Sequence, residues 1–208
     1  MKPKTTYASR KRPVQQRSRH TVSAILEATS QVLIQCGYDR TTTGAVAERA
    51  GVSIGTLYQY FPNKESLVAA LISEHVQDLL TLVETALATN ASQPLPVLLR
   101  AVIRAGLDAH RLNPALHKVL IEQVPREGAL ADAMGISERL TDMLQADIQQ
   151  RCPDLPSSQI RLAAFVVETT VEALTHRAVI ESPSWLTSGA LETEAMTLLL
   201  PYVTRALH

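Results

Sequence analysis

The chain has 208 residues, of which 46% are hydrophobic and only 4% aromatic, so its apolar mass is mainly Ala, Leu and Val. This length allows one large or two small domains with a hydrophobic core. No run of about 18 apolar residues is present, and no apolar stretch follows the charged N-terminus, so we expect neither a membrane span nor a signal peptide. Cys36 and Cys152 lie far apart without metal-ligand spacing, which favours two incidental thiols in a reducing cytoplasm.

The formal net charge of zero hides an asymmetry along the chain. Residues 1–66 carry ten Lys or Arg and four Asp or Glu, a net charge of +6, and residues 67–208 carry a net charge of −6. A basic N-terminal region can neutralise phosphates, whereas an acidic body is repelled by nucleic acid. The distribution therefore indicates a phosphate-binding head on an acidic body.

The first 16 residues are polar, with two prolines, five Lys or Arg and no acidic residue. Such a composition predicts a flexible arm. The arm either follows a DNA backbone or minor groove, as Arg-rich arms can, or is a solvated tail. From Arg17 to Cys36, apolar residues recur at helical spacing, and Gly37 is expected to end that helix.

Residues 41–67 have the pattern of a helix-turn-helix followed by a third helix. Thr42 or Thr43 can cap a first short helix, and Gly51 tolerates the left-handed conformation that would end it. Ser53 can cap a second helix over 54–60, which Pro62 then stops. These signals predict two short helices joined by a tight turn.

The second short helix is better suited to reading a surface than to filling a core. Its outward positions are expected to carry hydroxyls, an amide and aromatic rings, at Thr56, Tyr58, Gln59 and Tyr60. Such groups can reach base edges and phosphates from a helix in a major groove. Lys64, at the free amides of the next helix, completes a candidate phosphate site.

The run AERAGVSIGTLYQYFPNKESL, residues 47–67, resembles the DNA-binding segment of the tetracycline-repressor (TetR) family of bacterial transcription regulators. The resemblance extends over about 50 residues, from roughly Arg17 to Leu67. It implies a homodimer whose divergent C-terminal domain binds a small effector. Gly44 departs from the family pattern, which often has a polar or basic residue there. The predicted DNA-binding residues are Thr42, Thr43, Ser53, Ile54, Gly55, Thr56, Tyr58, Gln59, Tyr60 and Lys64.

The rest of the chain is expected to be helical. Hydrophobic residues recur at helical spacing in six segments, 63–88, 96–112, 114–124, 129–151, 157–180 and 190–207, and Gly135 is expected to loosen the fourth. No strand pattern or internal repeat is present. We therefore expect an all-α protein with a flexible arm at 1–16, a helix-turn-helix domain at 17–64 and a helical-bundle effector-binding and dimerisation body at 65–208.

Several polar residues interrupt the apolar helices of the body. A pocket in a helical bundle is mostly apolar with a few convergent polar groups. The candidate pocket residues are Arg104, His110, His117, Met134 and Glu168. Pro114 breaks the helical register between the two histidines, and no carboxylates or cysteines stand at fixed spacing, so no metal or cofactor site is predicted. No catalytic motif is present either, so we do not expect an enzyme.

The segment 157–180 is apolar on nearly all sides, which predicts burial on more than one flank. In a protein of this size, one flank is expected to meet another chain. The alternative is that this helix and the last one only complete the core of one protomer. The candidate dimer residues are Phe165, Thr169, Glu172, Ala173, Leu198 and Tyr202.

The sequence thus predicts a cytoplasmic, ligand-responsive regulator that represses transcription by occupying a palindromic operator as a homodimer. Two alternatives stay open. One is an activator or a regulator without an effector. The other is a small-molecule binding protein or enzyme with a vestigial head, against which Tyr58, Lys64 and the basic N-terminal region argue.

Overall fold

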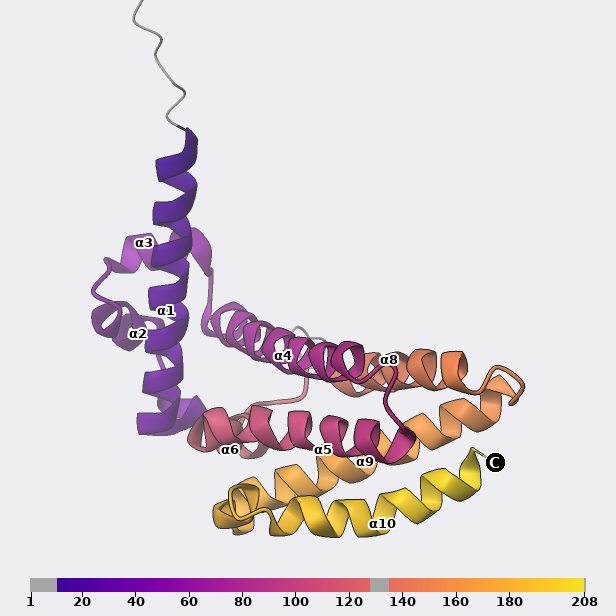
Figure 1. Ribbon diagram of the computed structural model, residues 1–208. Coiled ribbons are helices and arrows are strands. Elements are labelled where there is room, and N and C mark those ends of the chain that lie inside the picture. Colours follow the sequence, from indigo (N-terminus) through magenta and orange to yellow (C-terminus); the bar gives the residue numbers. More distant parts are fainter. Residues whose placement is uncertain (1–10, 128–134, 208) are drawn as a thin grey trace, which may run out of the picture. The chain divides into compact units, whose positions relative to one another are not determined.

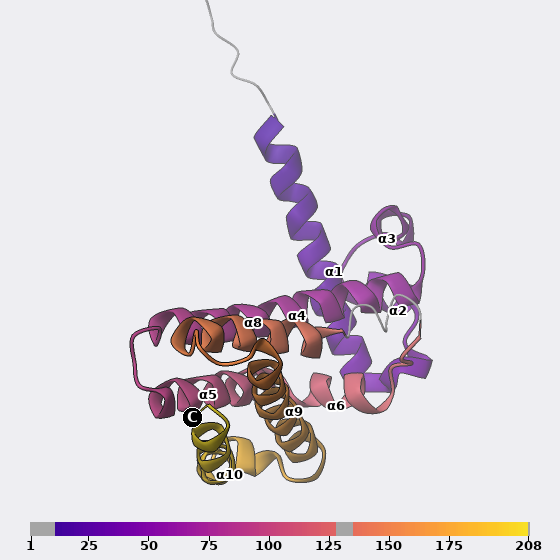
Figure 2. The same ribbon diagram turned by 90° about the vertical axis from the view of Figure 1, so that its right-hand side faces the viewer.

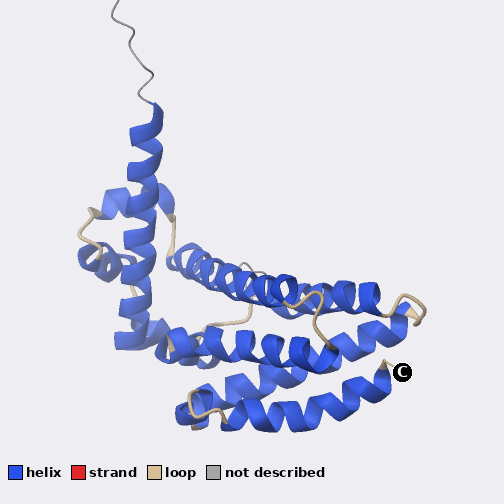
Figure 3. Cartoon of the chain, in the orientation of Figure 1, coloured by secondary structure: helices blue, strands red, loops and turns tan. Residues whose placement is uncertain are grey.

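The computed structural model describes residues 11–127 and 135–207, with side chains for 18–111, 113–127 and 135–207. Every regular element in these ranges is a helix (Figure 3), which confirms the all-α prediction. The chain divides into two compact units, Met1–Val68 and Ala69–His208. We call them the head and the body.

The head begins with α1 (Lys11–Arg40), whose helical path is interrupted at Gly37, at φ 78° and ψ 171°. The predicted break at Gly37 is therefore confirmed. The helix starts at Lys11 instead of Arg17, so the prediction of a flexible arm is wrong for residues 11–16. The charged side chains of this segment do not prevent it from continuing the helix. The remainder of the predicted arm, residues 1–10, lies outside the described residues.

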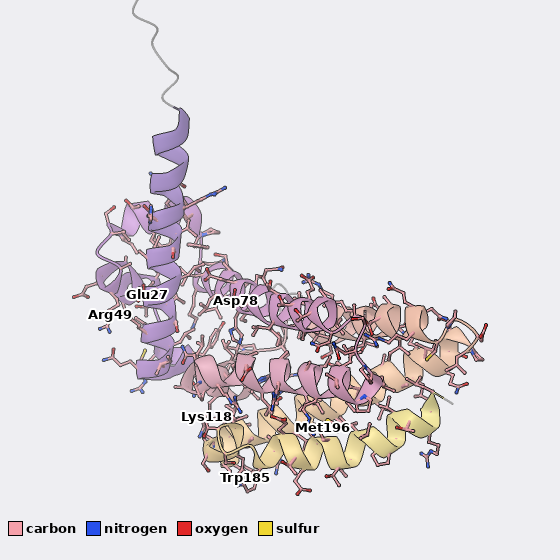
Figure 4. The ribbon with its side chains drawn as sticks, viewed as in Figure 1. Glu27, Arg49, Asp78, Lys118, Trp185 and Met196 are labelled. Atoms are coloured by element: carbon pink, nitrogen blue, oxygen red, sulfur yellow. The ribbon has the colours of Figure 1, made fainter. Side chains whose placement is uncertain are left out.

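Two short helices follow, α2 (Thr43–Arg49), which Thr42 caps, and α3 (Ile54–Tyr60), which has the predicted bounds. The first packs on α1 and the second packs on the first. The three helices share apolar side chains that are completely buried: Ile25, Leu33, Val46 and Leu57. Arg49, labelled in Figure 4, adds a polar link from α2 to α1 by donating to Oε1 of Gln31 over 2.6 Å.

The long helix α4 (Lys64–Thr89) begins in the head and continues into the body. Asn63 caps it, because its Oδ1 accepts from the backbone N–H of Ser66 at 2.7 Å. By length and composition alone, α4 could cross a membrane, whereas no membrane span was expected from the sequence. Of the most apolar 18 residues of α4, 39% are buried inside the protein. Leu79 and Val83 of α4 are buried in a hydrophobic cluster of the body.

Next come α5 (Leu95–Leu112) and α6 (Pro114–Glu122). Asn113 separates them and accepts from the N–H of Leu116 at 3.1 Å, as expected for a cap before a proline at the first helical position. The turn before α5 is held by Arg151, which donates to the carbonyl oxygens of Asn90 and Gln93.

The helix α8 (Ile136–Arg151) is shorter at its N-terminus than predicted. Gly135 stands at its N-cap, with φ −72° and ψ 51°, so the expectation that it loosens the middle of a helix is wrong. A residue with little helix propensity is better tolerated at a helix start than inside one. The part of the prediction over residues 128–134 lies outside the described residues.

The helix α9 (Ser157–Glu181) is central to the body, because it packs against α5, α6, α8 and α10. A short 3₁₀ turn, η1 (Pro183–Leu186), joins it to α10 (Ala190–Ala206). Figures 1 and 2 show α9 and α10 side by side and α4 beside α8. Met196 of α10 is buried in the resulting core, whereas Trp185 of η1 is 52% exposed (Figure 4).

Candidate DNA-reading and effector sites

The turn between α2 and α3 is formed by three local features that the sequence predicts. Oγ1 of Thr42 accepts from the N–H of Ala45 at 3.2 Å and starts α2. Gly51 has a left-handed φ of 66°, which a residue with a Cβ rarely adopts. Oγ of Ser53 accepts from the N–H of Thr56 at 3.0 Å and starts α3. Together these features place α3 across α2 with one face in solvent.

The outer face of α3 carries side chains that contribute little to the core. Ile54 is 44% exposed and Tyr58 is 49% exposed, and Gly55 and Gln59 are also exposed. The inner face is anchored by Leu57. Because only one face is needed for packing, the other is free to meet a ligand as large as DNA.

The hydroxyls beside α3 are paired with one another. Oγ1 of Thr43 lies 3.1 Å from the Tyr58 hydroxyl, and Oγ of Ser53 lies 2.8 Å from Oγ1 of Thr56. These pairs hold the predicted reading side chains in defined positions. Thr42 and Ser53 are exposed, whereas Thr43, Thr56 and Tyr60 are half-buried.

Lys64 has a structural partner that the sequence did not reveal. Its Nζ donates to the carbonyl oxygen of Tyr38 at 3.1 Å and stands 4.1 Å from the centre of the Tyr38 ring. The ammonium group thus ties the start of α4 to the end of α1. An ammonium has three donors, so this hydrogen bond leaves others for a phosphate.

Two glycines of the head are not explained by crowding within the protein. A Cβ at Gly55 would meet only Oγ of Ser53 at 3.8 Å, and one at Gly44 only Oγ1 of Thr42 at 3.9 Å. Glycine inside a helix is unfavourable by about 0.5–1 kcal/mol relative to Ala. Gly55 lies on the exposed face of α3, where the missing side chain allows close approach of an external molecule.

The body contains an apolar recess between α4, α5, α8 and α9, which we call the main recess. It holds about 540 Å³ of empty space, part of it open to solvent. Its walls are mainly aliphatic, with Leu79, Val83, Val102, Ile136, Leu140, Leu144, Val167 and Val171. The polar residues at its surface are His110, Glu168, Glu172, Thr175 and His176.

Two predicted pocket residues, His110 and Glu168, line the main recess, and each presents an unpaired buried atom. Nε2 of His110 and Oε1 of Glu168 have no hydrogen-bond partner among the described residues. Burial, together with the nearby Glu172 carboxylate, raises the pKa of Glu168. Burial lowers the pKa of His110 to about 4. The recess therefore holds a neutral imidazole and a carboxyl group whose pKa lies above its ordinary value.

The other three predicted pocket residues are not found among the described residues that line the main recess. Arg104 does not line the main recess, because its Nε donates to Oε2 of Glu192 at 2.8 Å on the outer side of α5. His117 lines a second recess, which shares His110, Glu172 and His176 with the first. Met134 lies outside the described residues.

The second recess brings together four histidines from four helices. His75, His110, His117 and His176 come from α4, α5, α6 and α9 respectively. Burial lowers the pKa of each of them. Sequence reasoning placed only His110 and His117 in one pocket, because the four residues are far apart in the chain and only the packing of the helices makes them neighbours.

Exposed apolar side chains form a stripe along α9, and α10 also has one large exposed apolar side chain. Leu162 is 59% exposed, Phe165 53% and Leu198 of α10 58%, and Thr169 and Ala173 continue the stripe at helical spacing. Glu172, which was also predicted for this face, lines the main recess and accepts from Ser137, and its place in an interface stays a prediction. Tyr202 is half-buried against the body core.

Two family models match the chain. The one described as "Bacterial regulatory proteins, tetR family" matches residues 25–71, and "Tetracyclin repressor-like, C-terminal domain" matches residues 94–202. The second match alone covers more than half of the chain, and the first includes the whole segment from α2 to α3.

Individual regulators are similar to the chain over different lengths. YvkB of Bacillus subtilis is 47% identical over 57 residues, which are 27% of this chain and 30% of that regulator. BetI of Cronobacter sakazakii is 26% identical over 88% of this chain and 89% of that regulator. The activator FasR of Mycolicibacterium smegmatis is 30% identical over 67% of this chain and 64% of that protein.

Solved structures share the fold. A TetR-family transcriptional regulator from Streptomyces coelicolor superposes with a TM-score of 0.70 at 26% identity, covering 92% of this chain and 100% of that one. FadR from Bacillus subtilis, solved in complex with stearoyl-CoA, gives a TM-score of 0.68 at 21% identity, covering 85% of this chain and 96% of that one.

Proposed function

Because this chain belongs to the TetR family of bacterial transcription regulators, we propose that it is a cytoplasmic repressor that binds a palindromic operator as a homodimer and is released by a small-molecule effector. In this proposal α3 enters the major groove and reads bases through Thr56 and Gln59. Tyr58 and Lys64 contact phosphates. The main recess of the body holds the effector.

The observation that carries the DNA-binding proposal is the exposed face of α3. Its side chains are held by hydroxyl pairs and caps, yet Ile54, Tyr58 and Gln59 project into solvent. A helix in the major groove needs such a face, since Gln can read adenine and hydroxyls can reach phosphates. Gly55 adds to the argument because it lets the α3 backbone approach DNA closely.

The test is a DNA-binding titration with a duplex selected by the wild-type protein from a random-sequence pool. Gln59→Ala should change which sequences are preferred, whereas Lys64→Ala should weaken binding to all duplexes and lower the salt dependence by about one phosphate contact. Gln77→Ala and Lys118→Ala, at exposed positions of the body, are the matched controls. Unchanged binding by both head variants would contradict the proposal.

The chemistry of the main recess limits the effector class. Its walls are aliphatic, and its charged groups are the carboxylates Glu168 and Glu172. Carboxylates repel anions, so we favour a mainly apolar molecule that is neutral or carries a cationic amine. FadR of Bacillus subtilis was solved with stearoyl-CoA, and an acyl-CoA is therefore the informative competitor in the test.

The effector test begins with thermal-shift screening of apolar amines and acyl-CoAs. A compound that binds is then titrated with and without the selected duplex. Coupling between two sites is reciprocal, so a releasing effector should bind DNA-bound protein about 5- to 150-fold more weakly. Glu168→Gln should weaken binding of an amine, and Glu122→Gln, at an exposed position of α6, should not. Equal affinities with and without DNA would exclude that compound as an effector.

The activator alternative has one specific point in its favour, since the relative FasR is an activator. In vitro transcription from a promoter carrying the selected duplex separates the two possibilities. Repression requires a fall in transcript when the wild-type protein is added, and activation requires a rise.

A further inference from the structure

The four histidines of the body form a contiguous cluster. The rings of His110 and His117 stack with their centroids 4.2 Å apart, and the ring of His75 meets that of His117 edge-on at 4.3 Å. The ring of His176 lies 5.1 Å from that of His110. The whole chain has six histidines, so most of them gather at this one place.

His110 is oriented as a metal ligand would be. Its Nδ1 lies 2.6 Å from the carbonyl oxygen of Gly106, and a carbonyl can only accept, so Nδ1 carries the proton and Nε2 presents a lone pair. That Nε2 is buried and has no hydrogen-bond partner among the described residues. An N–H donated to a backbone carbonyl is the usual way in which a protein orients a histidine that binds metal through its other nitrogen.

We propose that His110, His117 and His176 bind a divalent transition-metal ion of the zinc type. Each offers one nitrogen, and the three nitrogens lie within 4.8 Å of one another. In a tetrahedral site with Zn–N bonds of about 2.0–2.1 Å, the nitrogens are about 3.4 Å apart. Metal binding would therefore have to draw the imidazole rings closer together than they stand here. Imidazole ligands select Zn, Cu, Ni or Fe over Mg or Ca.

Two further side chains stand beside the three histidines, and neither belongs to the group of three close nitrogens. Oε1 of Glu172 lies 3.9 Å from Nδ1 of His176, and His75 lies within hydrogen-bonding distance of His117. Arg126 lines the same recess, and its positive charge opposes a cation. The Glu172 carboxylate offsets that charge. Three imidazoles with a fourth position open to water are a donor set that binds Zn²⁺.

Metal binding is a property separate from DNA regulation, and it can be measured without DNA. Full-length protein, first treated with a chelator, is titrated with Co²⁺ and followed by its visible absorption. We expect one ion per chain, with the absorption bands of four-coordinate Co²⁺, and we expect Zn²⁺ to displace it. Failure of the DNA-binding titrations would leave this result unaffected.

Variants locate the site. His110→Gln, His117→Gln and His176→Gln should each weaken Co²⁺ binding by at least about 10-fold and change the spectrum. His20→Gln, at an exposed position of α1, is the matched control and should bind like wild type. Circular dichroism checks folding, and the partly exposed His176 supplies a usable variant if the two buried ones do not fold. Co²⁺ binding that is absent in wild type, or unchanged in the folded cluster variants, would overturn the proposal.

Discussion

The head and the body place their polar side chains in opposite ways. In the described part of the head, hydroxyls pair at the surface, as Thr43 does with Tyr58, and every buried side-chain nitrogen or oxygen has a partner. In the body, Nε2 of His110 and Oε1 of Glu168 are buried and unpaired. The contrast suggests that the head acts through an outer face built from one continuous segment, and the body through an interior built from several helices.

The apolar stripe on α9 is the feature of the body that most resembles an exposed binding face. If it forms the dimer interface, Phe165→Glu should place a charge in that interface and raise the dimer dissociation constant by about 30-fold or more. Sedimentation velocity over a concentration series measures this. Val97→Glu, at a 44% exposed position of α5, is the control and should stay dimeric. A wild-type monomer at micromolar concentration would contradict the interface.

The interior of the body should be more sensitive to added volume than the head. A Cβ at Gly106 would lie 2.8 Å from Cγ1 of Val171, so α5 and α9 approach closely there. Gly106→Val should lower the free energy of unfolding by about 1–3 kcal/mol, because neither helix can move freely. Urea unfolding followed by circular dichroism tests this, and a variant as stable as wild type would show that the helices separate easily.

A charged link on the outside of the body should respond to pH. Glu192 of α10 accepts from Arg104 and Arg100 of α5, each at 2.8 Å. These hydrogen bonds, that of Arg104 first, lower the pKa of Glu192 below its ordinary value of 4.5. The unfolded chain therefore takes up a proton before the folded one does, so the stabilisation is present above about pH 4.5 and is lost as the pH falls through the folded pKa.

The corresponding variant is Glu192→Gln. At pH 7 it should unfold about 1 kcal/mol more easily than wild type, and the difference should shrink in acid. Glu194→Gln, at an exposed position of the same helix, is the control. A difference between wild type and Glu192→Gln that is the same at pH 7 and pH 4 would show that the stabilisation does not depend on the carboxylate charge.

The smallest expected effect on stability is in the head. Gly55→Ala should raise the free energy of unfolding by about 0.5–1 kcal/mol, because the methyl group has space and the unfolded chain loses freedom. The same change should weaken binding to the selected duplex, since the methyl group would stand where DNA approaches α3. Gly44→Ala is the matched control for stability. Stabilisation without loss of DNA affinity would show that the groove does not come close to Gly55.

Most of the head could be predicted because its signals are local. The cap residues Thr42 and Ser53, the left-handed Gly51 and the stop at Pro62 act within a few residues of themselves. They define α2, the turn and α3 with the observed bounds. The helical repeat also indicated the exposed positions of Tyr58 and Gln59, whereas Thr56 and Tyr60 are half-buried. The partner of Lys64 could not be read in this way, because Tyr38 is 26 residues away.

In the body the sequence determined the helices, since hydrophobic spacing and prolines are also local. It did not determine what the polar residues of those helices would meet. Arg104 pairs with Glu192 and does not line the main recess, and Glu172 lines that recess. A helix gives a side chain a direction, but only the neighbouring helices decide what that side chain meets. The histidine cluster is the clearest case. Four residues spread over about half of the chain become neighbours only when α4, α5, α6 and α9 pack together.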